Sequence, residues 1–452
     1  MRRAWYPAVA AATAVGLTIR IVTVYGRPGR IPGGDTYSYF WGANLLASGH
    51  GFINPWLFKA KPPQHLIQQS ASYPPLFLLL LSVVAAVGFK SFFAARIWTC
   101  ILGALAIPLA AYTGKEISGR RVGLLAAVIV AIYPNIWMND EMVMSEALSP
   151  VLALLVLLTA YRLWKQPRPT TAAAFGLSVG LAALGRDEMV LLAALAVPLI
   201  LLARRLAWRR RFGLLGVAAA AVVVIVGPWV GYNMARFAKP TFISTGFGVT
   251  LASANCRTTY DGQLAGYWSM PCALGTPGLN SHLDQSIASS IAQNHAIRFI
   301  KAHLGELPRV ELLREGRAFA FYRPIQQVYL DGLIETRPVH WAEVGLGSYY
   351  FLLALSVPGI VALRRRRIPI YPLIALGLDV AASVALAFGQ TRYRTVFEVS
   401  VVLAAAVGAD AILRAAGNSL RRRRDGAGHP GPLDGSEPLP SADPVLVGQT
   451  VG

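Results

Sequence analysis

One acidic residue near the start of the chain and two arginines near its end could act together on an anionic substrate. Asp35 follows two glycines and precedes a run of aromatic residues in the segment IPGGDTYSYFWGANLLASGHGF. Arg392 and Arg394 flank Tyr393 in the segment QTRYR. Two guanidiniums beside a tyrosine suit a phosphodiester or pyrophosphate, which they bind through paired, charge-assisted hydrogen bonds. Simpler explanations stay open for both features: Asp35 can cap a helix, and the arginines can anchor to ordinary lipid phosphates.

Other charged residues stand in short turns between apolar segments. The turn YPNIWMNDEMVMSEAL contains Asp140 and Glu141, and its Glu146 begins the next apolar segment. The turn GRDEM contains Arg186 and Glu188. Glu188 is equally well explained by local ion pairs in a solvated turn. Arg186 ends an apolar segment, where a buried charge is costly without a partner, so it is the stronger candidate for a site residue.

Long apolar segments must position these residues, and they predict a polytopic membrane protein. Of the 452 residues, 55% are hydrophobic and only 14% are charged. The formal net charge of +20 gathers largely in short arginine clusters between apolar segments, as at 364–367 and 421–424. Lysine and arginine accumulate on the cytoplasmic side of membranes, so this charge reports topology and excludes a nucleic-acid partner. The apolar segments lie at about 4–25, 75–89, 94–114, 121–138, 147–164, 170–186, 189–206, 213–233, 346–363, 369–388 and 395–415.

The distribution of basic residues predicts an all-α protein with about ten transmembrane helices and both termini in the cytoplasm. The first apolar segment follows Met1-Arg2-Arg3 and is interpreted as an uncleaved first span. Residues 75–89 are then expected to form an in-plane helix, because the first span already delivers the chain to the outer side. The predicted domains are a transmembrane module that contains the first outer loop, an extracytoplasmic loop domain, the last transmembrane helices and a disordered cytoplasmic tail, at 1–233 (loop 26–93), 234–345, 346–415 and 416–452.

The three cysteines predict one disulfide. Cys256 and Cys272 both lie in the large outer loop, and they can pair in an oxidising compartment. The bond would close a loop of about fifteen residues and constrain it by about 3 kcal/mol. The alternative is two free thiols, whereas no CxxC or paired-histidine spacing supports a metal site. Cys100 lies within an apolar segment and is expected to be a small buried residue.

The order of these features resembles the GT-C superfamily of polytopic glycosyltransferases, in particular its protein-mannosyltransferase and aminoarabinose-transferase-like branch. The resemblance rests on the acid of the first outer loop, the segment YPPL at Tyr73, the span GRRVGLLAAVIVAIYP, the turn that ends in SEAL, and the late RYR. It covers residues 20–235 and 385–415 and is weak in the large outer loop. Many relatives carry an Asp-Glu pair in the first outer loop, whereas Thr36 follows Asp35 here.

The resemblance implies a membrane-bound glycosyltransferase of the cell envelope, such as a mannosyltransferase or another hexosyl- or pentosyltransferase. The donor would be a sugar linked to a polyprenyl phosphate, a lipid that diffuses in the bilayer. The acceptor would be a glycan, lipid or protein on the extracytoplasmic side of the plasma membrane. Transfer would be a single inverting displacement in which the lipid phosphate leaves. Some GT-C enzymes use a divalent metal, but arginines can serve a monophosphate leaving group, so no cofactor is expected to be obligatory.

The resemblance also implies a role for each candidate residue. Asp35 would be the base that deprotonates the acceptor hydroxyl. Asp140 would place the acceptor or the donor sugar, with Glu141 as its partner. The residues that would hold the leaving phosphate are Arg186, Arg392, Tyr393 and Arg394. The residues that would line the same cavity are Tyr73 and Glu188.

A secondary transporter or lipid flippase is the alternative from another functional class. It would account for the spans and for the acids within them. It would not need outer loops of about seventy and a hundred residues, and such proteins usually show repeated halves. A second alternative is a non-catalytic assembly protein whose outer loops bind a partner. Replacing Asp35 by Asn separates these classes. A catalytic Asp35 predicts loss of sugar transfer from a polyprenyl-phosphate donor, and transfer at full rate would contradict that role.

Overall fold

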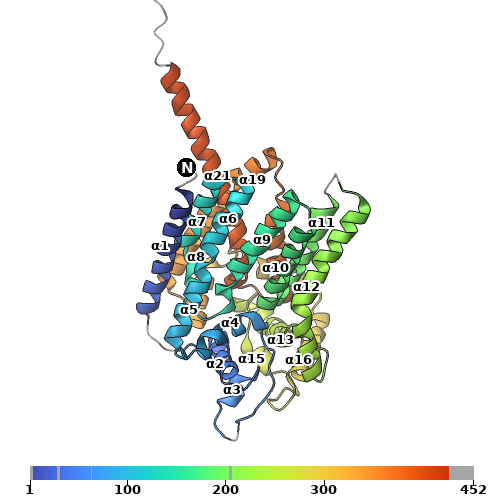
Figure 1. The fold of residues 1–452 in the computed structure, drawn as a ribbon. Helices are drawn as coiled ribbons and strands as arrows, with labels where there is room; N and C mark the ends of the chain where they lie inside the picture. The colour runs from blue at the N-terminus through green and yellow to red at the C-terminus, as the bar shows by residue number, and fades with distance from the viewer. Residues whose placement is uncertain (1–3, 28–30, 63, 203–205, 427–452) are drawn as a thin grey trace, which may run out of the picture. The chain divides into compact units, whose positions relative to one another are not determined.

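The computed structural model describes residues 4–27, 31–62, 64–202 and 206–426, and this part of the chain is mainly helical (Figure 1). Within these residues the structure contains no strand and one isolated β-bridge, between Ile53 and Gln69. The all-α fold predicted from the sequence is therefore confirmed.

Long apolar helices identify the chain as a multi-pass membrane protein. Among the described residues, six helices are long and apolar enough to cross a bilayer, and one bent helix pair is a seventh candidate. The six are α1 (Trp5–Tyr25), α5 with α6 (Phe92–Ala104 and Ala106–Ser118), η1 with α9 (Ser145–Ala147 and Ser149–Lys165), α12 (Trp208–Arg236), α19 (Val339–Arg365) and η4 with α21 (Thr391–Arg394 and Thr395–Gly426). The shorter apolar helices are α4 (Pro75–Ala86), α10 (Pro169–Gly185) and α20 (Tyr371–Leu386).

Each apolar segment found in the sequence corresponds to helical structure in the described residues, but three are divided, and the segment 94–114 is divided into α5 and α6 at Leu105. The segment 121–138 is divided into α7 (Arg120–Ile132) and α8 (Pro134–Asp140), which are bent by 57°. The bend follows from Pro134, because a proline disfavours helical geometry in the residue before it. The described part of the segment 189–206 is divided into η2 (Asp187–Leu195) and α11 (Ala196–Leu201), and residues 203–205 lie outside the described residues. The in-plane position of 75–89 stays a prediction.

The turns between helices gather at two ends of the helical part. At one end, Arg366 Nη1 donates to Ser118 Oγ (2.5 Å), and Lys165 pairs with Glu116 (3.0 Å). The basic residues at 115–121, 165–168 and 364–367 predict that the turns containing these contacts are cytoplasmic. Figure 1 shows the labelled helices of the two long loops, α2, α3, α13, α15 and α16, together at the opposite end. Turns predicted to share a side of the membrane therefore lie together.

Two long segments, residues 31–74 and 237–338, form what we call the loop region. Gln68 of the first half joins the two halves by donating to the carbonyl oxygens of Ser281 (3.1 Å) and Leu283 (2.7 Å) in the second. Its helices are α2 (Gly34–Ala47), α3 (Pro55–Phe58), α13 (Phe247–Ala254), α14 (Arg257–Tyr260), η3 (Gly262–Leu264), α15 (Met270–Leu274), α16 (Gln285–Ala302), α17 (Leu307–Ala318) and α18 (Pro324–Glu335).

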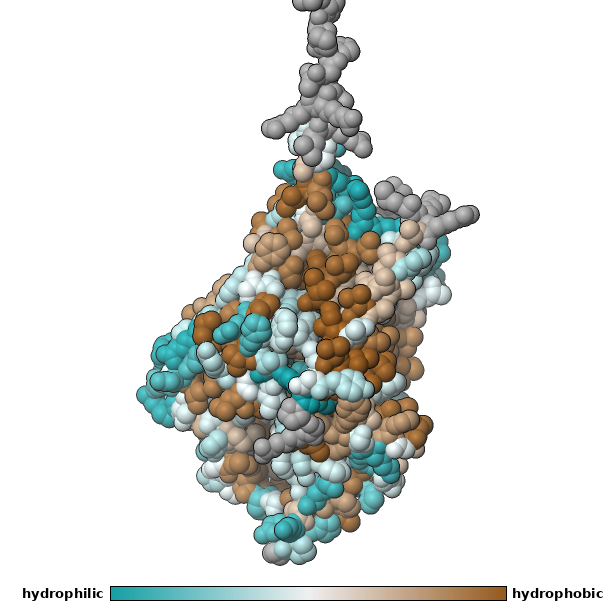
Figure 2. Space-filling model, turned by 90° about the vertical axis from the view of Figure 1, so that its left-hand side faces the viewer, coloured by the Kyte–Doolittle hydropathy of each residue, from teal (hydrophilic) through white to brown (hydrophobic). Residues whose placement is uncertain are grey.

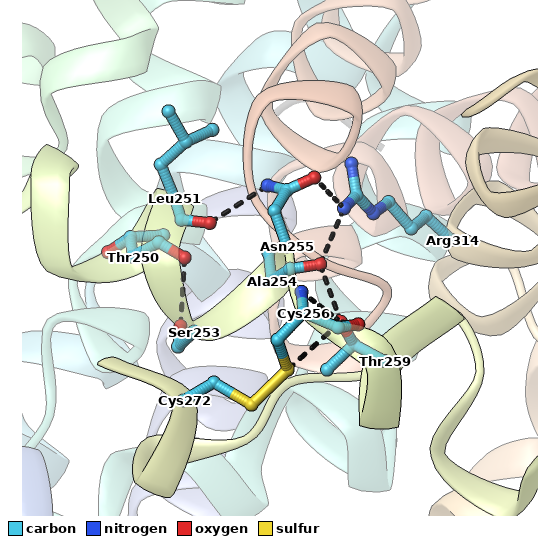
Figure 3. Close-up of a disulfide and its surroundings, with 9 residues drawn as sticks. All are labelled: Thr250, Leu251, Ser253, Ala254, Asn255, Cys256, Thr259, Cys272 and Arg314. Carbon is cyan, nitrogen blue, oxygen red and sulfur yellow. Dashed lines mark hydrogen bonds between the residues drawn. A yellow bond between two sulfur atoms is a disulfide. The ribbon is translucent and has the colours of Figure 1, made fainter. Parts of the chain in front are cut away.

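The predicted disulfide between Cys256 and Cys272 is present in the loop region (Figure 3). It joins the start of α14 to α15 across 16 positions of sequence. Beside it, Arg314 Nη2 donates to the carbonyl oxygen of Ala254 (2.7 Å) and to Asn255 Oδ1 (3.0 Å), as Figure 3 also shows. The bond and the arginine together fix the segment between α13 and α15.

The helices differ in how much of their surface is buried. The apolar part of α9 is mostly buried inside the helical part, whereas α1 and α12 bury little of theirs. On the face shown in Figure 2, hydrophobic residues form a broad area above a region of mixed polar and apolar residues. Apolar side chains that point outward are expected where helices face lipid.

The last helix continues farther than the sequence predicted. Helix α21 extends to Gly426, so residues 416–426, predicted to begin a disordered tail, are helical instead. Alanine, leucine and arginine are strong helix formers, which explains the extension. The predicted tail at 427–452 lies outside the described residues. By its contacts the chain divides into Met1–Ala411 and Ile412–Gly452, and the site described below lies in the first unit.

Candidate active site

A cavity of about 630 Å³ lies between the two halves of the loop region and the segment 388–392. Its wall carries hydroxyl and amide side chains and several aromatic rings. The charged residues among the described residues of the wall are Asp35, Glu335 and Arg392. A volume of about 300–1,000 Å³ is usual for a small-molecule site.

Asp35 is bound through both carboxylate oxygens. The Tyr73 hydroxyl donates to Oδ1 at 2.7 Å, and Arg392 Nη1 donates to Oδ2 at 2.5 Å. All three residues line the cavity, and the Asp35 side chain keeps 28% of its surface exposed. The structure thus brings together the acid near the start of the chain, the tyrosine of YPPL and one arginine of QTRYR.

The start of α2 explains how Asp35 is positioned. The N-cap of α2 is Gly33, and Gly34 has a φ of 66°, a conformation that glycine adopts at little cost. Asp35 follows in the first turn, where its negative charge favours the helix dipole. Its carboxylate accepts from Tyr73 and Arg392 instead of from the helix backbone. The capping explanation therefore does not describe this residue.

Two further carboxylates face another edge of the Arg392 guanidinium. Glu146 Oε1 and Glu335 Oε1 each lie 3.8 Å from Arg392 Nε. Glu146 belongs to η1 and Glu335 is the last residue of α18, so the group is assembled from distant parts of the chain. Only 17% of the Arg392 side chain is exposed, so water screens these charges weakly.

Arg186 shares the Glu146 carboxylate with Arg392. Its Nη1 is 3.2 Å from Glu146 Oε1 and its Nε is 2.6 Å from Glu188 Oε1. The guanidiniums of Arg186 and Arg392 lie 5.2 Å and 5.7 Å from the centre of the Tyr393 ring. Arg186, Glu188 and Tyr393 are absent from the described residues that line the cavity. The sequence predicted that Arg186 and Tyr393 bind phosphate and that Glu188 lines the cavity. The structure instead places these residues in contact with each other and with Arg392.

The two acids of the cavity wall have different ionisation properties. Burial favours a higher pKa for Asp35, but Arg392, the Tyr73 hydroxyl and Arg186 together hold that pKa below its usual value. Burial raises the pKa of Glu335 to about 7, and the neighbouring acids add to this effect while Arg337 and Arg392 oppose it. Asp35 is therefore ionised at neutral pH, whereas Glu335 titrates near it.

The predicted catalytic role of Asp140 and Glu141 is not supported by their position. Asp140 has no exposed surface and pairs with Arg20 at 2.5 Å. Glu141 pairs with Arg27 (2.7 Å) and Arg96 (3.1 Å), and only 1% of its side chain is exposed. Both acids therefore join helices together, and neither is among the described residues that line the cavity.

Arg394 also differs from its prediction. It is 3% exposed, pairs with Glu398 (2.7 Å) and lies over the Tyr349 ring at 3.9 Å. In a 3₁₀ turn residues two apart point in different directions, because the turn has three residues. Arg392 and Arg394 in η4 therefore cannot share one phosphate, and only Arg392 lines the cavity.

The side chains around Asp35 do not fit a divalent metal ion. No group of three or more His, Cys, Asp or Glu residues that could hold a metal occurs in the part of the chain that the structure describes. Both Asp35 oxygens already accept hydrogen bonds, and a guanidinium stands where a cation would bind. A metal ion there would be repelled by Arg392 at close range.

Glu146 and Glu335 are the site residues that the sequence analysis did not assign. Glu146 had a detectable signal, since it is an acid at the start of an apolar span. Glu335 had none, because it lies in the loop where the resemblance is weak and no local pattern distinguishes it.

A sequence model of the family described as dolichyl-phosphate-mannose-protein mannosyltransferase matches residues 72–231, about a third of the chain. This stretch contains Tyr73, Glu146 and Arg186 but neither Asp35 nor Arg392. Comparison with curated protein sequences gives no match.

The structure is similar to solved structures of an oligosaccharyltransferase from Archaeoglobus fulgidus. The complex with Zn and sulfate has a TM-score of 0.56 and 16% identity, over 90% of this chain and 49% of that one. The complex of AglB with an inhibitory peptide and a dolichol-phosphate has a TM-score of 0.54 and 14% identity, over 95% and 52%. The chain therefore shares their fold but spans about half their length.

Proposed function

We propose that this membrane protein, which has the GT-C fold predicted from its sequence, is a glycosyltransferase that takes its sugar from a polyprenyl-phosphate donor. The finer assignment is a hexosyl- or pentosyltransferase that works on the extracytoplasmic side of the plasma membrane. The description of the family whose sequence model matches residues 72–231 supports a sugar such as mannose. The dolichol-phosphate in the AglB complex supports a lipid-phosphate carrier.

The observation that carries the proposal is the contact between Asp35 and Arg392 in the wall of one cavity. Transfer of a sugar from a phosphate needs a group that takes a proton from the acceptor and a cation that stabilises the leaving phosphate. A carboxylate and a guanidinium supply these two functions. Their burial strengthens the attraction between the guanidinium and the leaving phosphate, because the local dielectric constant is lower than in water.

The reaction is a single displacement at the anomeric carbon. The acceptor oxygen forms a bond to that carbon while the bond from the carbon to the phosphate oxygen breaks. The phosphate leaves with the electron pair and is held by Arg392. The proton of the acceptor hydroxyl passes to Asp35. The anomeric configuration is inverted, because the acceptor attacks from the side opposite to the phosphate.

The wall of the cavity indicates the class of acceptor. Apart from Asp35, Glu335 and Arg392, the described residues that line it are uncharged. An acceptor with an ionised phosphate or carboxylate would find no counter-charge there except Arg392, which the donor requires. Hydroxyl, amide and aromatic groups such as Ser289, Asn280 and Trp268 suit a neutral, hydroxyl-rich acceptor.

Sugar transfer by the full chain in lipid vesicles tests the proposal. Vesicles are supplied with a polyprenyl-monophosphate donor that carries a labelled sugar, and product is measured with a neutral oligosaccharide acceptor. Asp35→Asn is expected to lose transfer, while Asp261→Asn, an exposed acid elsewhere in the loop region, is expected to retain it. Full-rate transfer by the Asp35→Asn variant would show that the assignment of the base is wrong.

A further inference from the structure

In the arrangement that the structure shows, Arg392 cannot bind both Asp35 and a donor phosphate through Nη1. Its Nη1 is hydrogen-bonded to Asp35 Oδ2 at 2.5 Å. A base that is bound to a guanidinium is a weak base, and a guanidinium that is bound to a carboxylate is a weak phosphate ligand. In the structure Asp35 and Arg392 therefore occupy each other.

The other edge of Arg392 is held by carboxylates that are themselves fixed. Glu146 lies 3.8 Å from Arg392 Nε and 3.2 Å from Arg186 Nη1. Arg186 is fixed in turn by Glu188 at 2.6 Å, and its side chain is 8% exposed. Glu146 is therefore a buried acid with one guanidinium on each side.

Glu335 has a similar arrangement. Its Oε1 lies 3.8 Å from Arg392 Nε and accepts a hydrogen bond from Gln390 Nε2 at 2.6 Å. Its Oε2 lies 2.7 Å from Arg337 Nε, and only 4% of its side chain is exposed. The Nε edge of Arg392 thus faces two anchored carboxylates.

The Asp35 side of Arg392 is the more open one. Asp35 keeps 28% of its side chain exposed, against 5% for Glu146 and 4% for Glu335. Asp35 and Glu335 both line the cavity, but Asp35 is the more exposed of the two, so an anionic ligand in the cavity meets Arg392 more readily on its Asp35 side. Asp35 is therefore the partner of Arg392 that a phosphate can replace.

We propose that Glu146 and Glu335 are positioning residues that hold Arg392 by its Nε edge while its Nη1 passes from Asp35 to the donor phosphate. This inference rests on the proposed function. The exchange frees the Asp35 carboxylate at the moment when the donor is in place. Asp35 then accepts the proton of the acceptor hydroxyl, while Arg392 stabilises the leaving phosphate. Without donor, Asp35 stays bound to Arg392 and does not activate water or acceptor.

Binding of a sugar-free polyprenyl monophosphate to the full-length protein in vesicles tests the exchange. If Asp35 competes with phosphate for Arg392, removing its charge must strengthen phosphate binding. Asp35→Asn is expected to bind the lipid phosphate about five-fold more tightly than the wild type, the size of a partly exposed ion pair. Arg392→Gln is expected to bind it more weakly. Asp261→Asn is the matched control and is expected to bind like the wild type, because it removes the same charge from an exposed acid that does not line the cavity.

Different binding results would overturn the proposed function and the exchange of Arg392 between Asp35 and phosphate. If the wild type does not bind the lipid phosphate, both the proposed function and the exchange are overturned. If the wild type binds it and Asp35→Asn binds equally or more weakly, the exchange is overturned while the proposed function stands.

A second comparison tests the positioning role by the direction of its effect. A purely electrostatic role for Glu146 predicts that Glu146→Gln binds phosphate more tightly, because a nearby negative charge is lost. A positioning role predicts weaker binding, because Arg392 is no longer held. Weaker binding by both Glu146→Gln and Glu335→Gln is expected, and tighter binding by both would overturn the positioning role. Thermal unfolding identifies a variant that merely fails to fold, and the other variant then decides.

Discussion

Arg392 Nη1 lies 2.5 Å from Asp35 Oδ2, although 357 positions of sequence separate the two residues. Neither belongs to the stretch 72–231 that matches a sequence model of a known family. The contact joins α2 in the loop region to η4 at the start of the last span. Because the two residues meet only in the folded protein, substitution of either one is expected to break the contact.

Substitutions of Arg392 are expected to separate charge from hydrogen-bond geometry. Arg392→Gln removes the charge that stabilises the leaving phosphate and is expected to lower kcat/KM about 10²- to 10³-fold. Arg392→Lys keeps the charge but loses the planar fork of donors, so its kcat/KM is expected to lie in between. Transfer of labelled sugar in vesicles measures both. Arg309→Gln is the control, since Arg309 is 58% exposed and lies away from the cavity. Wild-type kcat/KM in Arg392→Gln would contradict the role.

Tyr73→Phe is expected to change the pH dependence of transfer. The base must be ionised, so activity falls as the pH decreases through the pKa of Asp35. The Tyr73 hydroxyl is one of the groups that hold this pKa below its usual value. Its loss raises the pKa of Asp35 and moves the acid limb of kcat/KM to higher pH. The limb is measured in the wild type and the variant, and a limb that moves to lower pH would contradict the assignment.

Much of the fold was predictable from the sequence because it depends on local composition. Apolar runs and arginine clusters identified the helices and the turns that lie together. The apolar segment 121–138 was counted as one span, whereas the chain bends at Pro134, near the start of the predicted turn YPNIWMNDEMVMSEAL. The end of α21 was placed too early, because the polar residues after 415 lack apolar periodicity yet are good helix formers.

The site was predictable only in part, because the direction in which each side chain points decides whether it reaches the cavity. Asp35 and Arg392 were both chosen from the sequence, and the structure brings them together. Arg394, two residues later, was chosen on the same grounds but points into the protein. Glu335 could not be found, because its place beside Arg392 depends on how the second half of the loop region folds over the cavity.

A metal chelator is expected to leave sugar transfer unchanged. Both oxygens of Asp35 are bound by protein donors, and Arg392 supplies the positive charge that a metal ion would provide. Transfer is measured before and after EDTA treatment, with added Mg²⁺, Mn²⁺ or Zn²⁺ in parallel. Loss of transfer that a divalent ion restores would show that the cavity binds a metal in the working enzyme.

The disulfide is expected to stabilise the loop region. Cys256 and Cys272 enclose the segment that carries Trp268, a residue of the cavity wall. Replacing both cysteines by serine is expected to lower the free energy of unfolding by about 3 kcal/mol, because a loop of this length is no longer closed in the unfolded chain. Thermal unfolding with and without a reductant measures the effect. The reductant should lower the Tm of the wild type and leave that of the double variant unchanged.

Asp140→Asn is expected to reduce stability without changing the chemistry. Arg20 and Asp140 are both fully buried, and removing the charge of one partner leaves the other uncompensated, at a cost of about 3–5 kcal/mol. The site has no spare room, since a Cβ added at Gly103 would lie 2.2 Å from the Asp140 carboxyl group. Unfolding midpoints and transfer rates per folded molecule measure the two properties separately. Asp35→Asn should show the opposite pattern, with its Tm retained and transfer lost. A folded Asp140→Asn protein that no longer transfers sugar would instead return Asp140 to the catalytic group.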